Sequence, residues 1–251
     1  MTSSPVFEGD FTLGTLRTTA SHTTAIPHLV ELLRDVPSSA SAERYREAIV
    51  DGNILGRPTQ AGRQRSFRHL RELYFLDPAR PEFTALRHFW DIDPCSRPLL
   101  AGQLAFVRDE VLRASFAAIA DLPKGSGLTS ADLTAAVAAQ FGKEMSESTL
   151  GKTGRNTGAC WTQIGHLTGR SKKVRTGVEA RPAAIAYAAY LGHLAGGRGL
   201  GVLDNPWSQI LGIAPGRSLE ALRDAHAQGL IDLLVAGNVV DVSFPSLGGE
   251  A

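Results

Sequence analysis

Apolar residues recur every three or four positions along much of the chain, which is the spacing that one face of an α-helix requires. In the first half this pattern predicts helices over about 27–36, 41–52, 59–76, 81–91 and 98–121. We expect the last of these to be the spine of an all-helical domain, because one stripe of it carries Leu100, Leu104, Val107, Val111 and Ile119.

The second half of the chain combines helical stretches with a β-hairpin signal. The pattern predicts helices over about 129–141, 146–167, 179–197 and 218–229, and a further helix that begins at Pro206. Two apolar runs, 230–235 and 239–244, flank the turn-forming residues 236–238, and this arrangement is typical of a β-hairpin.

Four segments are expected in order along the chain. Residues 1–24 are rich in Ser, Thr and Gly and carry a few apolar side chains, which predicts an arm that docks Phe7, Phe11, Leu13 and Leu16. The stretch from Pro123 to Gly127 predicts a flexible join. We therefore expect an arm at 1–24, a helical domain at 25–125, a winged helix-turn-helix unit at 126–180 and a second winged-helix-like unit at 181–251.

The predicted helix from Ser146 has two distinct faces. Its apolar face carries Leu150, Thr153, Thr157, Cys160, Trp161, Ile164 and Leu167. The opposite face is cationic, amide or hydroxyl in character, which suits the major groove of DNA, and consists of Ser148, Lys152, Arg155 and Asn156. Three glycines, Gly151, Gly154 and Gly158, weaken a helix unless they permit close approach to phosphate or to a neighbouring helix.

A basic loop or ribbon follows this helix. From Gly151 to Gly177 the chain has six Lys or Arg and no acid, and the ribbon itself contributes Arg170, Lys172, Lys173 and Arg175. Two helices joined by a short glycine-containing turn and followed by a basic ribbon are the layout of a winged helix-turn-helix. A solvated surface helix with a basic loop is the alternative interpretation.

The predicted helix over 59–76 has an apolar face with Phe67, Leu70 and Tyr74, and it also carries a second basic stretch. Five arginines occur without an acid between them, and they are Arg57, Arg63, Arg65, Arg68 and Arg71. The guanidinium group suits phosphate, so these residues are candidates for extending a nucleic-acid footprint. A solvated face with an ion pair to Glu72 explains the same pattern equally well.

The last unit differs in charge from the one before it. Its predicted hairpin carries Asp232 and Asp241, and the preceding helix carries Glu220 and Asp224. Because carboxylates repel phosphate, this unit is expected to form a packing or partner surface. The predicted fold class is thus mainly α, an N-terminal helical bundle followed by one or two winged helix-turn-helix units with small β-hairpins.

Composition narrows the function classes further. The formal net charge is only +1, so any attraction to nucleic acid must come from local basic patches. Cys95 and Cys160 are the two cysteines, and their wide separation indicates neither a disulfide framework nor a zinc module, so we expect a cytoplasmic protein. No signal peptide or membrane span is predicted.

Motifs for catalysis are incomplete. Gly151-Lys152-Thr153 is similar to the end of a P-loop, but Ser146 stands where that motif needs a glycine. The seven histidines are scattered and form no metal-ligand spacing. We therefore expect no metal, no cofactor and no enzymatic activity, with a nuclease as the remaining catalytic alternative.

Several segments between about 41 and 175 resemble the BrxA family of BREX phage-defence systems. They are the run from Asn53 to Thr59, the run from Leu70 to Leu73, the apolar helix after Leu99, and the run from Ser146 to Leu150. The resemblance implies a small, mainly helical, non-catalytic protein that binds double-stranded DNA, with an N-terminal domain similar to the NusB fold and winged-helix elements after it. The glycine-rich helix and the long C-terminal unit depart from that pattern.

The leading hypothesis is a non-catalytic component of a phage-defence assembly whose partners are double-stranded DNA and other subunits of the system. Phosphate contacts alone do not distinguish duplex types, so RNA stays open as a second target. The alternative is an adaptor that uses its winged helices to bind protein.

Overall fold

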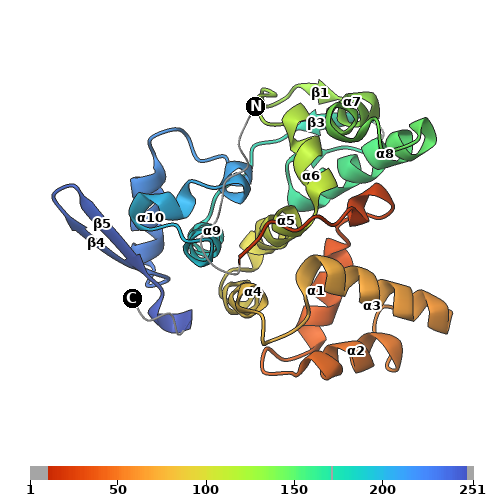
Figure 1. The fold of residues 1–251 in the computed structure, drawn as a ribbon. Coiled ribbons are helices and arrows are strands. Elements are labelled where there is room, and N and C mark those ends of the chain that lie inside the picture. Colours follow the sequence, from red (N-terminus) through yellow and green to blue (C-terminus); the bar gives the residue numbers. More distant parts are fainter. Residues whose placement is uncertain (1–10, 171, 248–251) are drawn as a thin grey trace.

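The computed structural model describes residues 11–170 and 172–247, and the chain there is mainly helical with small antiparallel sheets (Figure 1). Phe7, which we predicted to dock as part of the arm, lies outside the described residues. The N-terminal half begins with a 3-10 turn, η1 (Thr18–Ala20), and continues with α1 (Ile26–Asp35), α2 (Ala42–Val50), α3 (Gln60–Tyr74), α4 (Pro81–Ile92), η2 (Pro94–Ser96), α5 (Arg97–Arg108), α6 (Glu110–Ser115) and η3 (Phe116–Ala118).

The prediction of a single helix over 98–121 is wrong, because the helix is interrupted at Asp109. This residue has an extended backbone, and its side chain accepts a hydrogen bond from the backbone N–H of Leu112, so it caps a new helix, α6. The apolar stripe itself is confirmed: its five members, from Leu100 to Ile119, are all buried.

A compact unit follows in the order β1 (Gly127–Leu128), α7 (Ser130–Phe141), α8 (Glu147–Ile164), β2 (Leu167–Thr168) and β3 (Lys173–Arg175). Its three strands form an antiparallel sheet in which β3 lies between β1 and β2. Ser146 caps α8, because its side chain accepts a hydrogen bond from the Thr149 N–H. The predicted end near 167 is wrong, because Gly165 adopts a left-handed φ of 104° and ends the helix, and Leu167 then enters β2.

The C-terminal part is built on α9 (Pro182–Leu194), which is buried along most of its length and lies between the N-terminal helices and the last elements (Figure 1). It is followed by η4 (Gly199–Leu203), η5 (Pro206–Leu211), α10 (Ser218–Ala227), β4 (Asp232–Ala236), β5 (Val239–Ser243) and η6 (Pro245–Leu247). The hairpin is confirmed, whereas the stretch from Pro206 is a 3-10 turn instead of an α-helix, and α9 is shorter than predicted.

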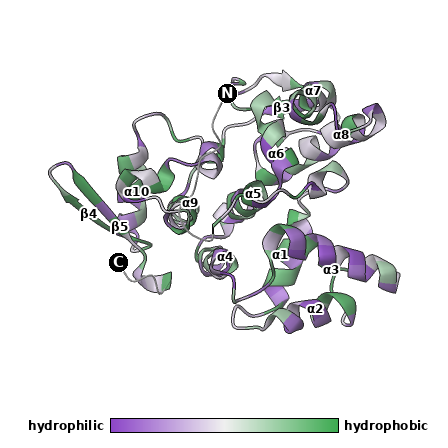
Figure 2. Ribbon diagram, in the orientation of Figure 1, coloured by the Kyte–Doolittle hydropathy of each residue, from purple (hydrophilic) through white to green (hydrophobic). Residues whose placement is uncertain are grey.

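One cluster of buried hydrophobic side chains runs through all of these parts, from Phe11 through Trp161 to Phe244. A smaller cluster joins α6 to α7 through Val111, Val137 and Phe141. The predicted domain boundaries therefore stay predictions, because the buried core is continuous across them. Each helix in the described part of the chain is too short or too polar to cross a lipid bilayer. Figure 2 shows α9 as strongly hydrophobic and α3 as largely hydrophilic.

Packing against α7 explains two of the three glycines of α8. A Cβ atom on Gly154 would lie 2.2 Å from Thr134 Oγ1 and 2.4 Å from the backbone oxygen of Ser130, and one on Gly158 would lie 3.1 Å from Leu133 Cδ1. Gly151 faces open space, since the nearest atom to its Cβ would be an Arg155 guanidinium nitrogen at 3.9 Å. Close helix packing thus requires glycine at position 154 and not at position 151.

Gly154 and Gly151 form a matched pair for a stability test. We expect Gly154→Ala to lower the free energy of unfolding by about 1–3 kcal/mol, because the added methyl group forces α7 and α8 apart. Gly151→Ala should raise it by up to about 1 kcal/mol through helix propensity alone. Urea denaturation followed by circular dichroism measures both changes, and equal effects of the two substitutions would contradict the packing argument.

Candidate nucleic-acid interface

Residues 17–24, which include η1, lie between α3 and α8 and contact both helices (Figure 1). On the α3 side, the Tyr74 hydroxyl donates to the Thr24 backbone oxygen at 2.7 Å. On the α8 side, the Gln163 amide oxygen accepts hydrogen bonds from the Thr24 hydroxyl at 2.8 Å and from the Ile26 N–H at 3.2 Å. This segment, called the bridging segment below, joins two helices that are far apart in sequence.

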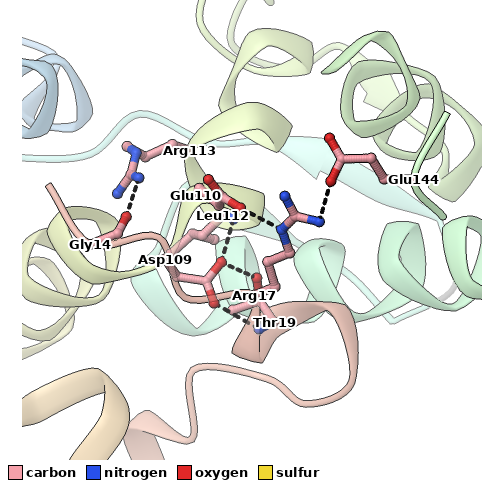
Figure 3. Close-up of polar contacts among 8 residues, drawn as sticks. All are labelled: Gly14, Arg17, Thr19, Asp109, Glu110, Leu112, Arg113 and Glu144. Atoms are coloured by element: carbon pink, nitrogen blue, oxygen red, sulfur yellow. Dashed lines mark hydrogen bonds and ion pairs between the residues drawn. The ribbon is translucent and has the colours of Figure 1, made fainter. Parts of the chain in front are cut away.

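The bridging segment is anchored to α6 through a buried carboxylate. Asp109 accepts hydrogen bonds from the Thr19 N–H at 2.8 Å, the Thr19 hydroxyl at 2.7 Å and the Leu112 N–H at 2.8 Å (Figure 3). Burial raises the pKa of Asp109, while these three hydrogen bonds and the nearby charge of Arg113 act to lower it.

Two arginines complete the anchor. Arg17 forms ion pairs with Glu110 and Glu144, and its guanidinium carbon lies 4.6 Å from the centroid of the Phe141 ring. Arg113 donates to the Gly14 backbone oxygen, as Figure 3 shows. Glu144, which lies just before α8, is therefore compensated by a cation of the bridging segment.

The structure places the four polar-face residues of α8 in two different settings. Ser148, Lys152 and Arg155 are exposed. Asn156 is half-buried, and its side-chain amide donates to the Ala20 backbone oxygen at 3.2 Å. Asn156 thus holds η1 in place, while the other three side chains face solvent opposite the buried Cys160 and Trp161.

The basic ribbon, which comprises β2, β3 and the residues between them, also contains both exposed cations and cations bonded to protein atoms. Arg170 and Lys172 are exposed. The Lys173 ammonium donates to the Thr162 hydroxyl and the Gly169 backbone oxygen, both at 2.8 Å, and the Arg175 guanidinium donates to the backbone oxygens of His166 and Thr176. Desolvation lowers the pKa of both Lys173 and Arg175.

Of the five arginines at and before α3, three are exposed, namely Arg65, Arg68 and Arg71. Arg57 and Arg63 are half-buried, and Arg57 donates to His28 Nε2 at 3.0 Å. The apolar face predicted for this helix is confirmed, because Leu70 and Tyr74 are buried and Phe67 packs against the core.

The structure brings cations of α3 and α8 together around one histidine that the sequence analysis missed. Besides burial, the charges of Lys152, Arg65 and Arg68 all lower the pKa of His22, which follows η1 in the bridging segment. No local sequence signal marks His22, because its neighbours come from residues 65–69 and 152. Two basic patches that are separate in sequence therefore meet at His22.

His166 and Cys160, whose side chains could in principle act in catalysis or bind a metal, are buried in the core. His166 is fully buried, its Nε2–H donates to the Ile210 backbone oxygen at 2.9 Å, and burial lowers its pKa to about 4. Burial raises the pKa of Cys160 to about 12, so its thiol stays protonated. Among the residues that the structure describes, no group of three or more His, Cys, Asp or Glu side chains is arranged to hold a metal ion.

No protein-family model matches the chain, and no curated protein matches it either.

Substitutions in the ribbon can distinguish the cations that donate to protein oxygens from the cations that face solvent. We expect Lys173→Ala combined with Arg175→Ala to lower the free energy of unfolding by about 1–3 kcal/mol, because charged donors to the ribbon backbone are lost. The matched pair Arg170→Ala and Lys172→Ala should change it by less than about 0.5 kcal/mol. Thermal or urea unfolding measures both, and an equal loss in the two double variants would show that the hydrogen bonds of Lys173 and Arg175 do not stabilise the ribbon.

Proposed function

We propose that this chain binds double-stranded DNA without catalysing a reaction on it, as a component of a BREX phage-defence assembly. The observation that carries the proposal is the exposed cationic face of α8, with Lys152 and Arg155 turned away from the core and the basic ribbon following the same helix. The element order β1–α7–α8–β2–β3 supports the proposal of a winged helix-turn-helix in which α8 is the recognition helix.

In this proposal only some of the candidate residues of α8 and the basic ribbon contact DNA. Ser148, Lys152 and Arg155 approach base edges in the major groove, and Arg170 and Lys172 bind backbone phosphates. Asn156, Lys173 and Arg175 position these elements, because their donors are directed to protein oxygens.

The partner assembly is inferred from the resemblance to BrxA proteins. That resemblance also supports a domain similar to the NusB fold in the helical N-terminal part and contacts with other subunits of the defence system. Arg65, Arg68 and Arg71 extend the DNA footprint onto α3, since all three are exposed.

A titration of a mixed-sequence DNA duplex by fluorescence anisotropy at several salt concentrations tests the proposal. We expect salt-sensitive binding, and Arg170→Ala with Lys172→Ala should reduce the log–log salt slope by about 1–2 because two phosphate contacts are removed. Lys152→Ala with Arg155→Ala should weaken binding by roughly tenfold or more.

Arg217→Ala with Arg223→Ala is the charge-matched control, because it removes two arginines from the region of α10, on the opposite side of the molecule from α8 (Figure 1). This variant should bind the duplex as the wild type does. Absence of duplex binding even at low salt would refute the proposal, and tighter binding of a matching RNA duplex would reassign the ligand.

The second candidate function is protein binding by the β4–β5 hairpin. Leu234 and Val239 are each 67% exposed and Val235 is 39% exposed, on a two-stranded sheet that extends from the body of the molecule (Figure 1). Cross-strand register places Leu234 beside Asp241, and Asp232 is on the same strand, so the partner surface is apolar with a basic rim.

A substitution on the hairpin separates this function from DNA binding. We expect Leu234→Ser combined with Val239→Ser to abolish co-purification with co-expressed defence-system subunits at high salt, while leaving duplex affinity unchanged. Pull-down of the tagged wild type and the variant measures the first, and the anisotropy titration measures the second. Retention of every subunit by the variant would exclude the hairpin as the docking surface.

A further inference from the structure

Two imidazole rings lie where α3 meets the bridging segment. The ring of His22 lies 4.7 Å from that of His69, measured between centroids, with the planes inclined at 37°. His22 is exposed, whereas His69 belongs to α3, is half-buried and has a buried Nε2 without a hydrogen-bond partner. Only His22 is therefore placed to meet a ligand directly.

The groups that face His22 are mostly cationic. The charges of Arg65 and Arg68 on α3 and of Lys152 on α8 lower the pKa of His22, and only the carboxylate of Glu72 on α3 acts to raise it. Glu72 also accepts a hydrogen bond from the Thr18 hydroxyl at 3.2 Å, so its charge is partly engaged within the protein. Three cations against one carboxylate make this a site of positive potential.

We propose that Arg65, Arg68 and His22 form one binding site for a backbone phosphodiester of duplex DNA beside Lys152, and that protonation of His22 strengthens binding as the pH falls. This inference rests on the proposed DNA-binding function and adds to it a residue, a junction between α3 and α8, and a regulation by pH. The bridging segment carries His22 into the junction, because it is tied to α3 through Tyr74 and to α8 through Asn156 and Gln163.

The direction of the pH effect follows from the surrounding charges. In the free protein, partial desolvation and the charges of the three neighbouring cations lower the pKa of His22, which favours the neutral ring. A bound phosphate offsets those cations and stabilises the imidazolium, which raises the pKa in the complex. Binding and protonation then favour each other, and DNA affinity increases as the pH falls through the pKa of the complex.

The neighbouring His69 does not become charged over the pH range in which His22 titrates. Burial, with a smaller contribution from His22, lowers the pKa of His69 to about 4, so His69 stays neutral while His22 titrates. The neutral His69 ring packs at a tilt against His22 without competing for the proton.

The test is a set of duplex titrations at constant ionic strength between about pH 8 and about pH 6. Wild-type affinity should rise roughly threefold to tenfold over this range, which corresponds to a pKa increase of up to about one unit on binding. His22→Gln should lose most of this increase. His88→Gln, which removes a half-buried histidine of α4, is the matched control and should retain it.

A second variant tests the phosphate contact without relying on titration. Arg65→Ala combined with Arg68→Ala should weaken duplex binding at both pH values and reduce the salt slope by about 1–2. If the duplex binds but His22→Gln keeps the full pH dependence, or loses affinity equally at every pH, the inference is wrong and the proposed function stands. If no protein binds the duplex at any pH, the proposed function itself fails.

Discussion

The buried carboxylate of Asp109 is the interaction on which the arrangement of α3, α6 and α8 depends. It ends the run of α5, caps α6 and accepts two hydrogen bonds from Thr19, so one side chain sets a helix break and docks the bridging segment. Removing such a partner leaves buried donors unsatisfied, at a cost of about 1–3 kcal/mol each. The carboxylate thus determines both the local backbone and the position of a segment 90 residues away in sequence.

The basic residues of this chain fall into two groups with different physical roles. Lys173, Arg175 and Arg57 donate to protein atoms and stabilise the ribbon and the approach to α3. Lys152, Arg155, Arg170 and Lys172 are exposed and can neutralise an external anion. A formal net charge of +1 is compatible with an anion-binding face, because Glu110 and Glu144 are paired with Arg17 and the acids of the C-terminal unit lie elsewhere.

Periodicity predicted the faces of α3 and α8, because a helical face depends only on residues within a few turns. The β4–β5 hairpin was also predicted from a local signal, the turn-forming residues 236–238. The break at Asp109 was missed because an apolar stripe continues across it, and the capping carboxylate is stabilised by Thr19, which no local pattern connects to it. The partners of Asn156 and the cluster around His22 were missed for the same reason, since Asn156 and Ala20 are 136 positions apart.

The bridging segment also has a consequence for synthesis of the chain. Thr19 and Thr24 leave the ribosome early, but their partners Asp109 and Gln163 are made 90 and 139 residues later. Until Gln163 has emerged, α3 and the bridging segment have no α8 to dock against, and closing such long loops slows folding. The junction at His22 therefore cannot form before α8 has been made, and a nascent or truncated chain that ends before α8 lacks it even when its N-terminal helices are folded.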